Sequence, residues 1–181
     1  MTTKYEDIHR DVIESCKKGD VRAQYQLYAL YNKAMYNICY RMTNAQEEAE
    51  DMLQESFTYA FSRLGSFRFE SSFGAWLKRI VVNTCINHLK KSKVDLVYTE
   101  QHDDPLPDDD YVDYAEIKFK ADQVMEAMDK LPQGYRVVLS LYLLEGYDHG
   151  EISEILGITE STSKSQYLRA KKKIKEIMSH E

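Results

Sequence analysis

The amino-acid sequence predicts an all-α fold in which two small helical domains are joined by an acidic, flexible linker. Glycine and proline, the two residues that interrupt helices, number only 7 and 3 among 181 residues. Apolar side chains recur at helical spacing before and after a middle segment that is rich in aspartate. These observations place one domain at residues 1–93, the linker at 94–115 and a second domain at 116–181.

The middle segment is predicted to be a linker because its composition opposes packing. It contains Pro105, Pro107 and aspartates at positions 103, 104 and 108–110. Repulsion among the acids, together with the prolines, disfavours a packed helix. A flexible linker is therefore favoured over the alternative, an acidic strip that mimics DNA.

Charge is unevenly distributed along the chain, whose formal net charge is −6. Residues 1–93 hold 14 basic and 11 acidic residues, residues 94–120 hold 2 and 9, and residues 121–181 hold 8 and 10. The acidity therefore lies mainly in the middle segment, and both flanks keep basic faces that can meet nucleic acid.

Membrane and secretory features are not found in the sequence. No run of about 18 apolar residues is present, which argues against membrane insertion, and the first residues lack the apolar core of a signal peptide. We therefore expect a cytoplasmic protein. Cys16, Cys39 and Cys85 are widely spaced and form no Cys-x-x-Cys pair, so neither a metal site nor a cofactor is expected.

In the first domain, a short helix is predicted around residues 8–16 and a long one over 21–41. Asp20 can cap the long helix, because its carboxylate can accept hydrogen bonds from free backbone N–H groups. Tyr25, Tyr28 and Tyr36 recur along this helix. Such a stripe is more typical of core packing than of base stacking, which is the alternative.

A third helix is predicted over about residues 45–64, with Asn44 and Glu47 forming a capping box at its start. Its acidic and amide residues Asp51, Gln54 and Glu55 lie opposite its apolar face. This face has two interpretations. It is either a solvated surface favoured by the helix dipole or a docking surface for a basic partner helix.

An aromatic loop follows Gly65 and leads into a fourth helix, predicted over about residues 73–91, with Ser71 or Ser72 as its cap. The rings of Phe67 and Phe69 offer walls of the kind that hold an unstacked base. One side of the fourth helix carries Arg79, Asn83, Asn87 and Lys90. Such side chains can bind phosphates and read bases, but an ordinary polar helix face fits the spacing equally well.

The second domain is expected to begin with a helix near Ala115, to turn at residues 132–134 and to end in a helix-turn-helix. Gly157 can end a short helix at 150–156 in a left-handed conformation, and Thr159 or Ser161 can cap the next helix. Residues 161–175 carry six basic residues and no acid. Such a helix suits the phosphate backbone and the major groove of DNA, and a solvated basic helix is the alternative.

Three stretches in this order resemble bacterial sigma factors of the extracytoplasmic-function type. Residues 48–57 (EAEDMLQESF) resemble the polymerase-binding helix of that family, and residues 67–80 (FRFESSFGAWLKRI) with Asn83 resemble its promoter-melting loop and helix. Residues 131–173, beginning LPQGYRVV, resemble its fourth conserved region. The resemblance covers about residues 8–178.

The resemblance implies a promoter-specificity factor that binds core RNA polymerase, recognises and opens the −10 element, and reads the −35 element as duplex DNA. The implied partners are the β′ coiled coil and the β flap of the polymerase, promoter DNA and an anti-sigma factor. The residues that the resemblance assigns to the polymerase are Asp51, Gln54, Glu55 and Phe57. Those assigned to the −10 element are Phe67, Phe69, Ser71, Arg79, Asn83 and Asn87, and those assigned to the −35 element are Thr162, Lys164, Ser165, Arg169, Lys171 and Lys172.

The chain also departs from the family pattern at several positions. Ser163 stands where many members have a small aliphatic residue, and Gln166 stands where many have arginine. Many relatives carry an aromatic-acid pair where this chain has His149 and Gly150. The first two departures leave the identity of the −35 bases undefined.

Two other functions compete with this interpretation. A stand-alone helix-turn-helix regulator, with a sensing or dimerising N-terminal domain, explains the basic helix but not the aromatic loop or the Arg/Asn stripe. An enzyme is disfavoured, because the five histidines show no metal-ligand spacing and no phosphate loop or nucleophile motif is present.

Overall fold

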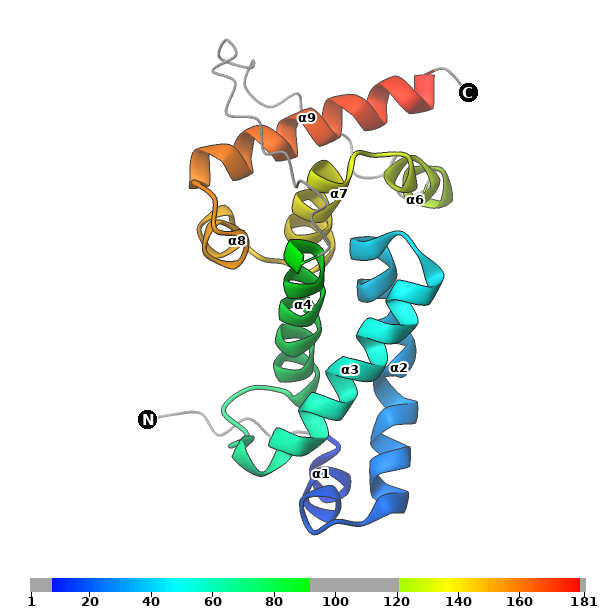
Figure 1. The fold of residues 1–181 in the computed structure, drawn as a ribbon, viewed down its shortest axis with the longest axis vertical. Coiled ribbons are helices and arrows are strands. Elements are labelled where there is room, and N and C mark those ends of the chain that lie inside the picture. The colour runs from blue at the N-terminus through cyan, green and yellow to red at the C-terminus, as the bar shows by residue number, and fades with distance from the viewer. Residues whose placement is uncertain (1–7, 92–120, 180–181) are drawn as a thin grey trace. The chain divides into compact units, whose positions relative to one another are not determined.

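The computed structural model describes residues 8–91 and 121–179, and these residues form helices joined by turns and short loops, without a strand. They form two compact units, one within residues 1–93 and the other within residues 94–181 (Figure 1). The predicted all-α class is confirmed. The linker at 94–115 and the helix start near Ala115 lie outside the described residues. No described helix combines the length and the apolar character that a membrane span requires.

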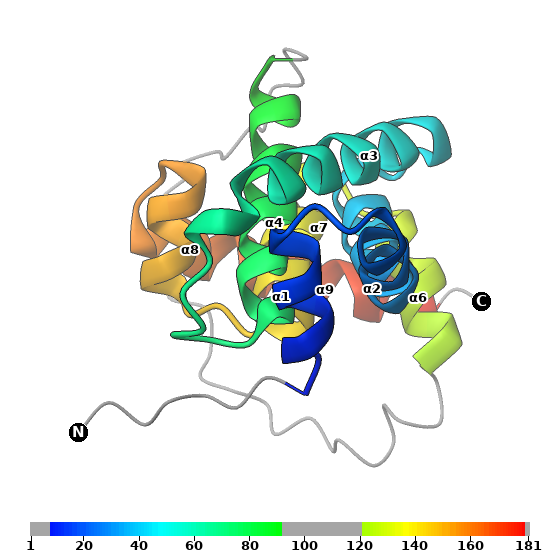
Figure 2. The ribbon, with the colours of Figure 1, turned by 90° about the horizontal axis from the view of Figure 1, so that it is seen from below.

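The described part of the first unit contains four α-helices and one short 3₁₀ turn. These are α1 (Arg10–Lys17), α2 (Val21–Thr43), α3 (Gln46–Arg63), η1 (Leu64–Ser66) and α4 (Phe73–Lys91). Helix α2 packs against α1, α3 and α4, and α3 also packs against α4 (Figure 2). The core between them includes the fully buried Ile13, Leu27 and Phe73.

Polar side chains cap the starts of α2 and α4. The Asp20 carboxylate accepts hydrogen bonds from the backbone N–H groups of Arg22 at 2.8 Å and Ala23 at 3.3 Å, so its predicted capping role is confirmed. At α4, the Ser72 hydroxyl accepts from the Ala75 N–H at 3.1 Å. Since a free N–H at a helix start costs free energy, these side chains decide where α2 and α4 begin.

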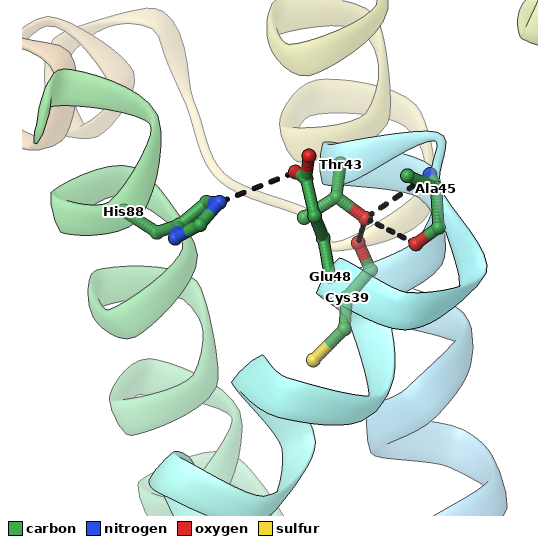
Figure 3. A network of polar contacts seen from close by, with 5 residues as sticks. All are labelled: Cys39, Thr43, Ala45, Glu48 and His88. Carbon is green, nitrogen blue, oxygen red and sulfur yellow. Dashed lines mark hydrogen bonds and ion pairs between the residues drawn. The ribbon is translucent and has the colours of Figure 1, made fainter. Parts of the chain in front are cut away.

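The predicted capping box of Asn44 and Glu47 is wrong. Asn44 instead ends α2 in the left-handed conformation, with φ of 59°, a conformation that asparagine tolerates better than most residues. The residue before α3 is Ala45, which offers no side-chain cap. The Thr43 hydroxyl lies at this corner and donates to the carbonyl of Cys39 at 3.0 Å (Figure 3).

Two buried cysteines, Cys39 of α2 and Cys85 of α4, lie next to one another in the core of this unit. A hydrogen bond with Cys39, followed by burial, raises the pKa of Cys85 well above its ordinary range. Both therefore behave as small apolar side chains, as their sequence context predicts. The tyrosine stripe packs only in part, because Tyr25 is 75% exposed while Tyr28 is half-buried.

The second unit is built around its last helix. It contains α6 (Ala121–Asp129), α7 (Gln133–Leu139), a π-helical turn η2 (Ser140–Leu144), α8 (His149–Leu156) and α9 (Glu160–Ser179). Helix α9 packs against α6, α7 and α8. A buried cluster of Met128, Leu131, Leu139 and Ala170 lies between α9 and the preceding helices. The buried Arg136 donates to the carbonyl of Leu131 at 2.9 Å, across the turn before α7.

The helix-turn-helix prediction is confirmed at the level of local geometry. Asp148 and Glu151 form a capping box at the start of α8. Gly157 ends α8 with φ of 72°, which only glycine adopts without strain. The Thr159 hydroxyl then accepts from the Thr162 N–H at 3.0 Å, so of the two candidate caps Thr159 is the one that starts α9.

Candidate nucleic-acid and polymerase interfaces

The outward side of α9 carries a polar and basic stripe, which we call the α9 stripe: Lys164, Ser165, Leu168, Arg169, Lys171 and Lys172. Lys164 and Lys172 are exposed and the other four are half-buried. Lys164 forms an ion pair with Glu160 at 2.7 Å one turn earlier on the helix. Because the pair is exposed, a phosphate can displace Glu160 at little cost.

Leu168 is a member of the α9 stripe that the sequence reasoning missed. It lies one turn after Lys164 and is half-buried. An apolar side chain between two basic ones can contact a thymine methyl group in the major groove. The signal in the sequence was its position four residues after Lys164, which places it on the same side of the helix.

Thr162 belongs to the opposite side of α9. The side chain is 7% exposed, and its hydroxyl lies 2.7 Å from that of Thr159. Its predicted entry into the major groove is therefore not supported, because the side chain is used in the N-terminal cap. The buried side of α9 contains Thr162, Ser163, Gln166 and Ala170.

The two departures at Ser163 and Gln166 are buried in the second unit. Neither side chain is exposed at all, so neither presents a polar group to DNA in this structure. Among the described residues, the Gln166 side chain has no hydrogen-bond partner for either its amide nitrogen or its oxygen. A buried amide without partners is costly, so Gln166 is a weak point in the packing of α9.

Ser163 is bonded to His149, and this contact joins the two helices of the helix-turn-helix. His149 Nδ1 lies 2.9 Å from the Ser163 hydroxyl oxygen. The imidazole also stacks on Tyr142, with ring centroids 4.5 Å apart, and meets the edge of Tyr167 at 5.7 Å. Burial, followed by the charge of Lys164, lowers the pKa of His149. Burial and the nearby lysine therefore favour the neutral form of this imidazole.

Helix α3 presents the acidic face that the sequence predicts. Asp51, Gln54 and Glu55 are all exposed, and none of them forms an ion pair that the described structure records. Phe57 differs from these three, because it is only 3% exposed. Its ring centroid lies 4.7 Å from that of Tyr28 on α2. The acidic face is thus available to a partner, whereas Phe57 supports it from within the core.

The loop between η1 and α4 has an aromatic interior and a polar rim. Phe67 and Phe69 are 4% and 6% exposed, and the Phe67 ring packs on Phe69, Phe73 and Trp76 at centroid distances of 4.8, 5.7 and 5.2 Å. The prediction that these two rings form open walls for an unstacked nucleotide base is corrected, because both rings are buried beneath the loop. The rim consists of Arg68, Glu70 and Ser71, which are exposed.

Beyond this loop, the Arg/Asn stripe of α4 is exposed. Arg79, Asn83, Asn87 and Lys90 are all exposed on α4. The amides of Asn83 and Asn87 can both donate and accept hydrogen bonds. The structure therefore brings an exposed polar rim and an exposed amide stripe onto consecutive segments of one unit.

A contact that the sequence did not indicate connects helices α3 and α4. His88 Nε2 of α4 lies 3.2 Å from a carboxylate oxygen of Glu48 on α3 (Figure 3). The residues that it joins are 40 positions apart in the chain. Within the described residues, no group of three or more His, Cys, Asp or Glu side chains is arranged to hold a metal ion.

The all-helical units, the helix-turn-helix and the α9 stripe define a DNA-binding protein of the helix-turn-helix class. Sigma-70 region 2 matches residues 27–94, and sigma-70 region 4 matches residues 121–174. The chain is 30% identical over 176 residues to the ECF RNA polymerase sigma factor SigW of Bacillus subtilis, with 90% of this chain and 92% of SigW covered. The chain belongs to the ECF RNA polymerase sigma factors.

A second relative and a solved structure are also similar to this chain. Identity is 27% over 177 residues to the ECF RNA polymerase sigma factor SigM of Mycobacterium tuberculosis, covering 98% of this chain and 88% of SigM. The fold resembles that of the sigma factor RpoE of Bartonella quintana, solved with the anti-sigma factor NepR, at a TM-score of 0.55 and 20% identity over 88% of this chain and 98% of that one. Sigma factors are transcription initiation factors, so the stand-alone regulator is not favoured.

Proposed function

We propose that this chain binds core RNA polymerase, directs it to promoters and helps to open them. In this proposal, residues 1–93 bind the polymerase and recognise the −10 element, residues 94–115 are the linker, and residues 116–181 read the −35 element. The observation that carries the proposal is the exposed polar rim of the aromatic loop, followed along the chain by the exposed Asn83 and Asn87. A stand-alone regulator has no use for that combination.

Polymerase binding is assigned to the acidic face of α3. Asp51, Gln54 and Glu55 are exposed and face away from the apolar core of the first unit. Docking against a basic side of the β′ coiled coil requires such an accessible acidic face. Complementary charge of this kind speeds association and disfavours wrong partners. The second unit is proposed to contact the β flap.

Duplex recognition is assigned to the α9 stripe. Lys164, Ser165 and Arg169 are proposed to contact base edges and phosphates in the major groove, with Lys171 and Lys172 on the phosphate backbone. Lys171 Nζ lies 5.5 Å from the centroid of the Tyr167 ring, one turn earlier on the helix. Thr162 is left out, because its hydroxyl belongs to the cap.

Strand opening is assigned to the first unit. A base whose pairing edge is to be read must leave the stack, at a cost of a few kcal/mol. The loop rim at Arg68, Glu70 and Ser71 is proposed to receive that base, and Arg79, Asn83 and Asn87 are proposed to hold the opened strand. Phe67 and Phe69 then act from below by shaping the loop.

The remaining expectations follow from the family. An anti-sigma factor is proposed as a further partner, since the B. quintana relative was solved with one. The proposed place of action is the cytoplasm, where polymerase and promoters meet. The protein is proposed to act without a cofactor and without catalysing a reaction of its own.

Reconstituted transcription tests this function directly. The purified chain and core RNA polymerase are given a library of randomised promoter DNA, and the starts of the transcripts are sequenced. We expect starts that share a −10 and a −35 motif and that depend on the chain. Tight, sequence-specific binding of duplex DNA by the chain alone, without an effect on transcript starts, would instead indicate a stand-alone regulator.

A further inference from the structure

Helix α1 contacts the aromatic loop through two cations. Lys17 Nζ donates a hydrogen bond of 2.7 Å to the carbonyl of Phe67, across 50 positions of sequence. The same nitrogen lies 4.4 Å from the centroid of the Phe69 ring, and Arg10 Cζ lies 4.3 Å from it. We call Arg10 and Lys17 the α1 clamp.

The loop needs such support because its backbone is strained at Phe69. This residue has φ of 59°, in a left-handed region that a bulky residue occupies only when its surroundings over-determine it. The Phe69 ring is buried against Phe67 on one side, at a centroid distance of 4.8 Å. Contacts with the two cations then hold both the ring and the adjacent carbonyl.

The strained turn determines where the rim points. Phe69 turns inward, whereas its neighbours Arg68 and Glu70 are exposed, as is Ser71. If Phe69 relaxed to an ordinary backbone conformation, these neighbours would change direction together. The conformation of one buried residue therefore sets the geometry of the surface proposed to receive an extruded base.

We propose that Arg10 and Lys17 are positioning residues for base recognition: the α1 clamp holds Phe69 in its left-handed conformation and so presents the loop rim to an unstacked nucleotide base. This inference rests on the proposed strand-opening function of the loop. Lys17 acts through the loop and does not itself contact DNA. Its ammonium is half-buried and shared among the Phe67 carbonyl, the Phe69 ring and Glu14 at 3.8 Å.

The chain offers a matched control in the next residue. Lys18 is an exposed lysine directly after α1, and it differs from Lys17 in having no recorded contact with the loop. If α1 contributed only general positive charge toward DNA, loss of either lysine would weaken binding similarly. If the clamp positions the loop, only loss of Lys17 changes base selection.

The test uses holoenzyme assembled from the full chain and core polymerase. Its probes are single-stranded oligonucleotides that carry the −10 element of the promoter found by sequencing transcript starts. At the position of the base that the loop rim is proposed to receive, each probe has either the preferred base or a different one. The affinity ratio of the two probes measures base selection. We expect Lys17→Met to reduce this ratio about tenfold, as loss of a charge-assisted hydrogen bond implies. Lys17→Arg and Lys18→Met should keep it.

The affinity of the variants for core polymerase provides the second readout. A purely structural defect would lower that affinity and the base-selection ratio together, whereas a positioning defect lowers the ratio alone. An unchanged ratio in folded Lys17→Met overturns the inference. If Lys17→Met does not fold, Arg10→Met is the second variant, because it keeps the Lys17 hydrogen bond. Arg10→Met should reduce the base-selection ratio about threefold through the lost cation–π contact. An unchanged ratio in Arg10→Met also overturns the inference. Failure of the wild-type holoenzyme to select any base would refute the proposed function itself.

Discussion

His149 Nδ1 of α8 lies 2.9 Å from the hydroxyl oxygen of Ser163 of α9, and this hydrogen bond joins the two helices that form the DNA-reading motif. The imidazole is half-buried between Tyr142 and Tyr167. The charged and titratable groups around it are Lys164 and Glu160 on α9 and Asp148 at the start of α8.

The stability of this motif should fall in mildly acidic solution. Because burial and then Lys164 lower the pKa of His149 below its ordinary value of 6.5, the unfolded chain binds a proton more readily than the folded one. The stabilising contribution is complete above pH 6.5 and is lost as the pH falls through the folded pKa. Thermal unfolding of the full chain between pH 7.5 and 5, compared with His149→Gln, measures it. Parallel pH curves for the two proteins would contradict the assignment.

Charge reversal on α3 should separate polymerase binding from folding. Asp51→Lys combined with Glu55→Lys places like charges against a basic partner, which costs several kcal/mol. Co-purification with core polymerase should be lost while helical circular dichroism is kept. Gln46→Lys is the control, since Gln46 is exposed on the same helix and lies half a turn around it from Glu55. Polymerase retained by the folded double variant would refute the docking surface.

Arg169 of the α9 stripe should contribute to recognition of the −35 element. Arg169→Ala is expected to weaken promoter binding by about 1–3 kcal/mol if the guanidinium reads a base, and the loss should then depend on the base sequence. A contact with phosphate alone would give a uniform loss and a shallower salt dependence. Lys33→Ala, which removes an exposed positive charge from α2 in the first unit, is the control for loss of charge alone. Equal promoter affinity of Arg169→Ala and wild type at every salt concentration would remove Arg169 from the interface.

Asn83 and Asn87 should be required for opening but not for assembly. The double variant Asn83→Ala, Asn87→Ala is expected to bind core polymerase normally and to lose thymine reactivity toward permanganate at the −10 element of a matched duplex. Opening should be restored on a template already mismatched there, because strand separation is no longer needed. The exposed Asn37 of α2 offers the control Asn37→Ala. Normal opening of the matched duplex by the double variant would exclude both amides from the mechanism.

Gln166 should be replaceable with a gain in stability. Both polar atoms of its side chain are buried without a partner among the described residues. Gln166→Leu removes that penalty at similar volume, so the free energy of unfolding should rise by about 1–3 kcal/mol. Denaturant unfolding measures the change, and promoter binding should persist because Gln166 is buried away from the α9 stripe. A destabilised variant would indicate that the amide has a partner after all.

Much of this architecture is local and could be predicted from the sequence. The cap at Asp20, the left-handed Gly157 and the cap at Thr159 each depend on a few adjacent residues, so their side-chain chemistry was sufficient. The corner at Asn44 was mispredicted because asparagine favours both the start and the end of a helix, and only the path of the chain distinguishes the two. The exposed acids of α3 and the bases of α9 followed from helical spacing alone.

Contacts between distant segments were decided by the tertiary structure. Helical spacing places Phe57 and Thr162 on a side of a helix, but the helices packed against them determine that both are buried. The α1 clamp joins Lys17 to a loop 50 residues later, and His88 meets Glu48 across 40 residues. The sequence by itself determined the helices, their caps and the family. Side-chain partners at such separations depend on how the helices pack, because a period of 3.6 residues specifies a direction around one helix axis and not the neighbour that lies there.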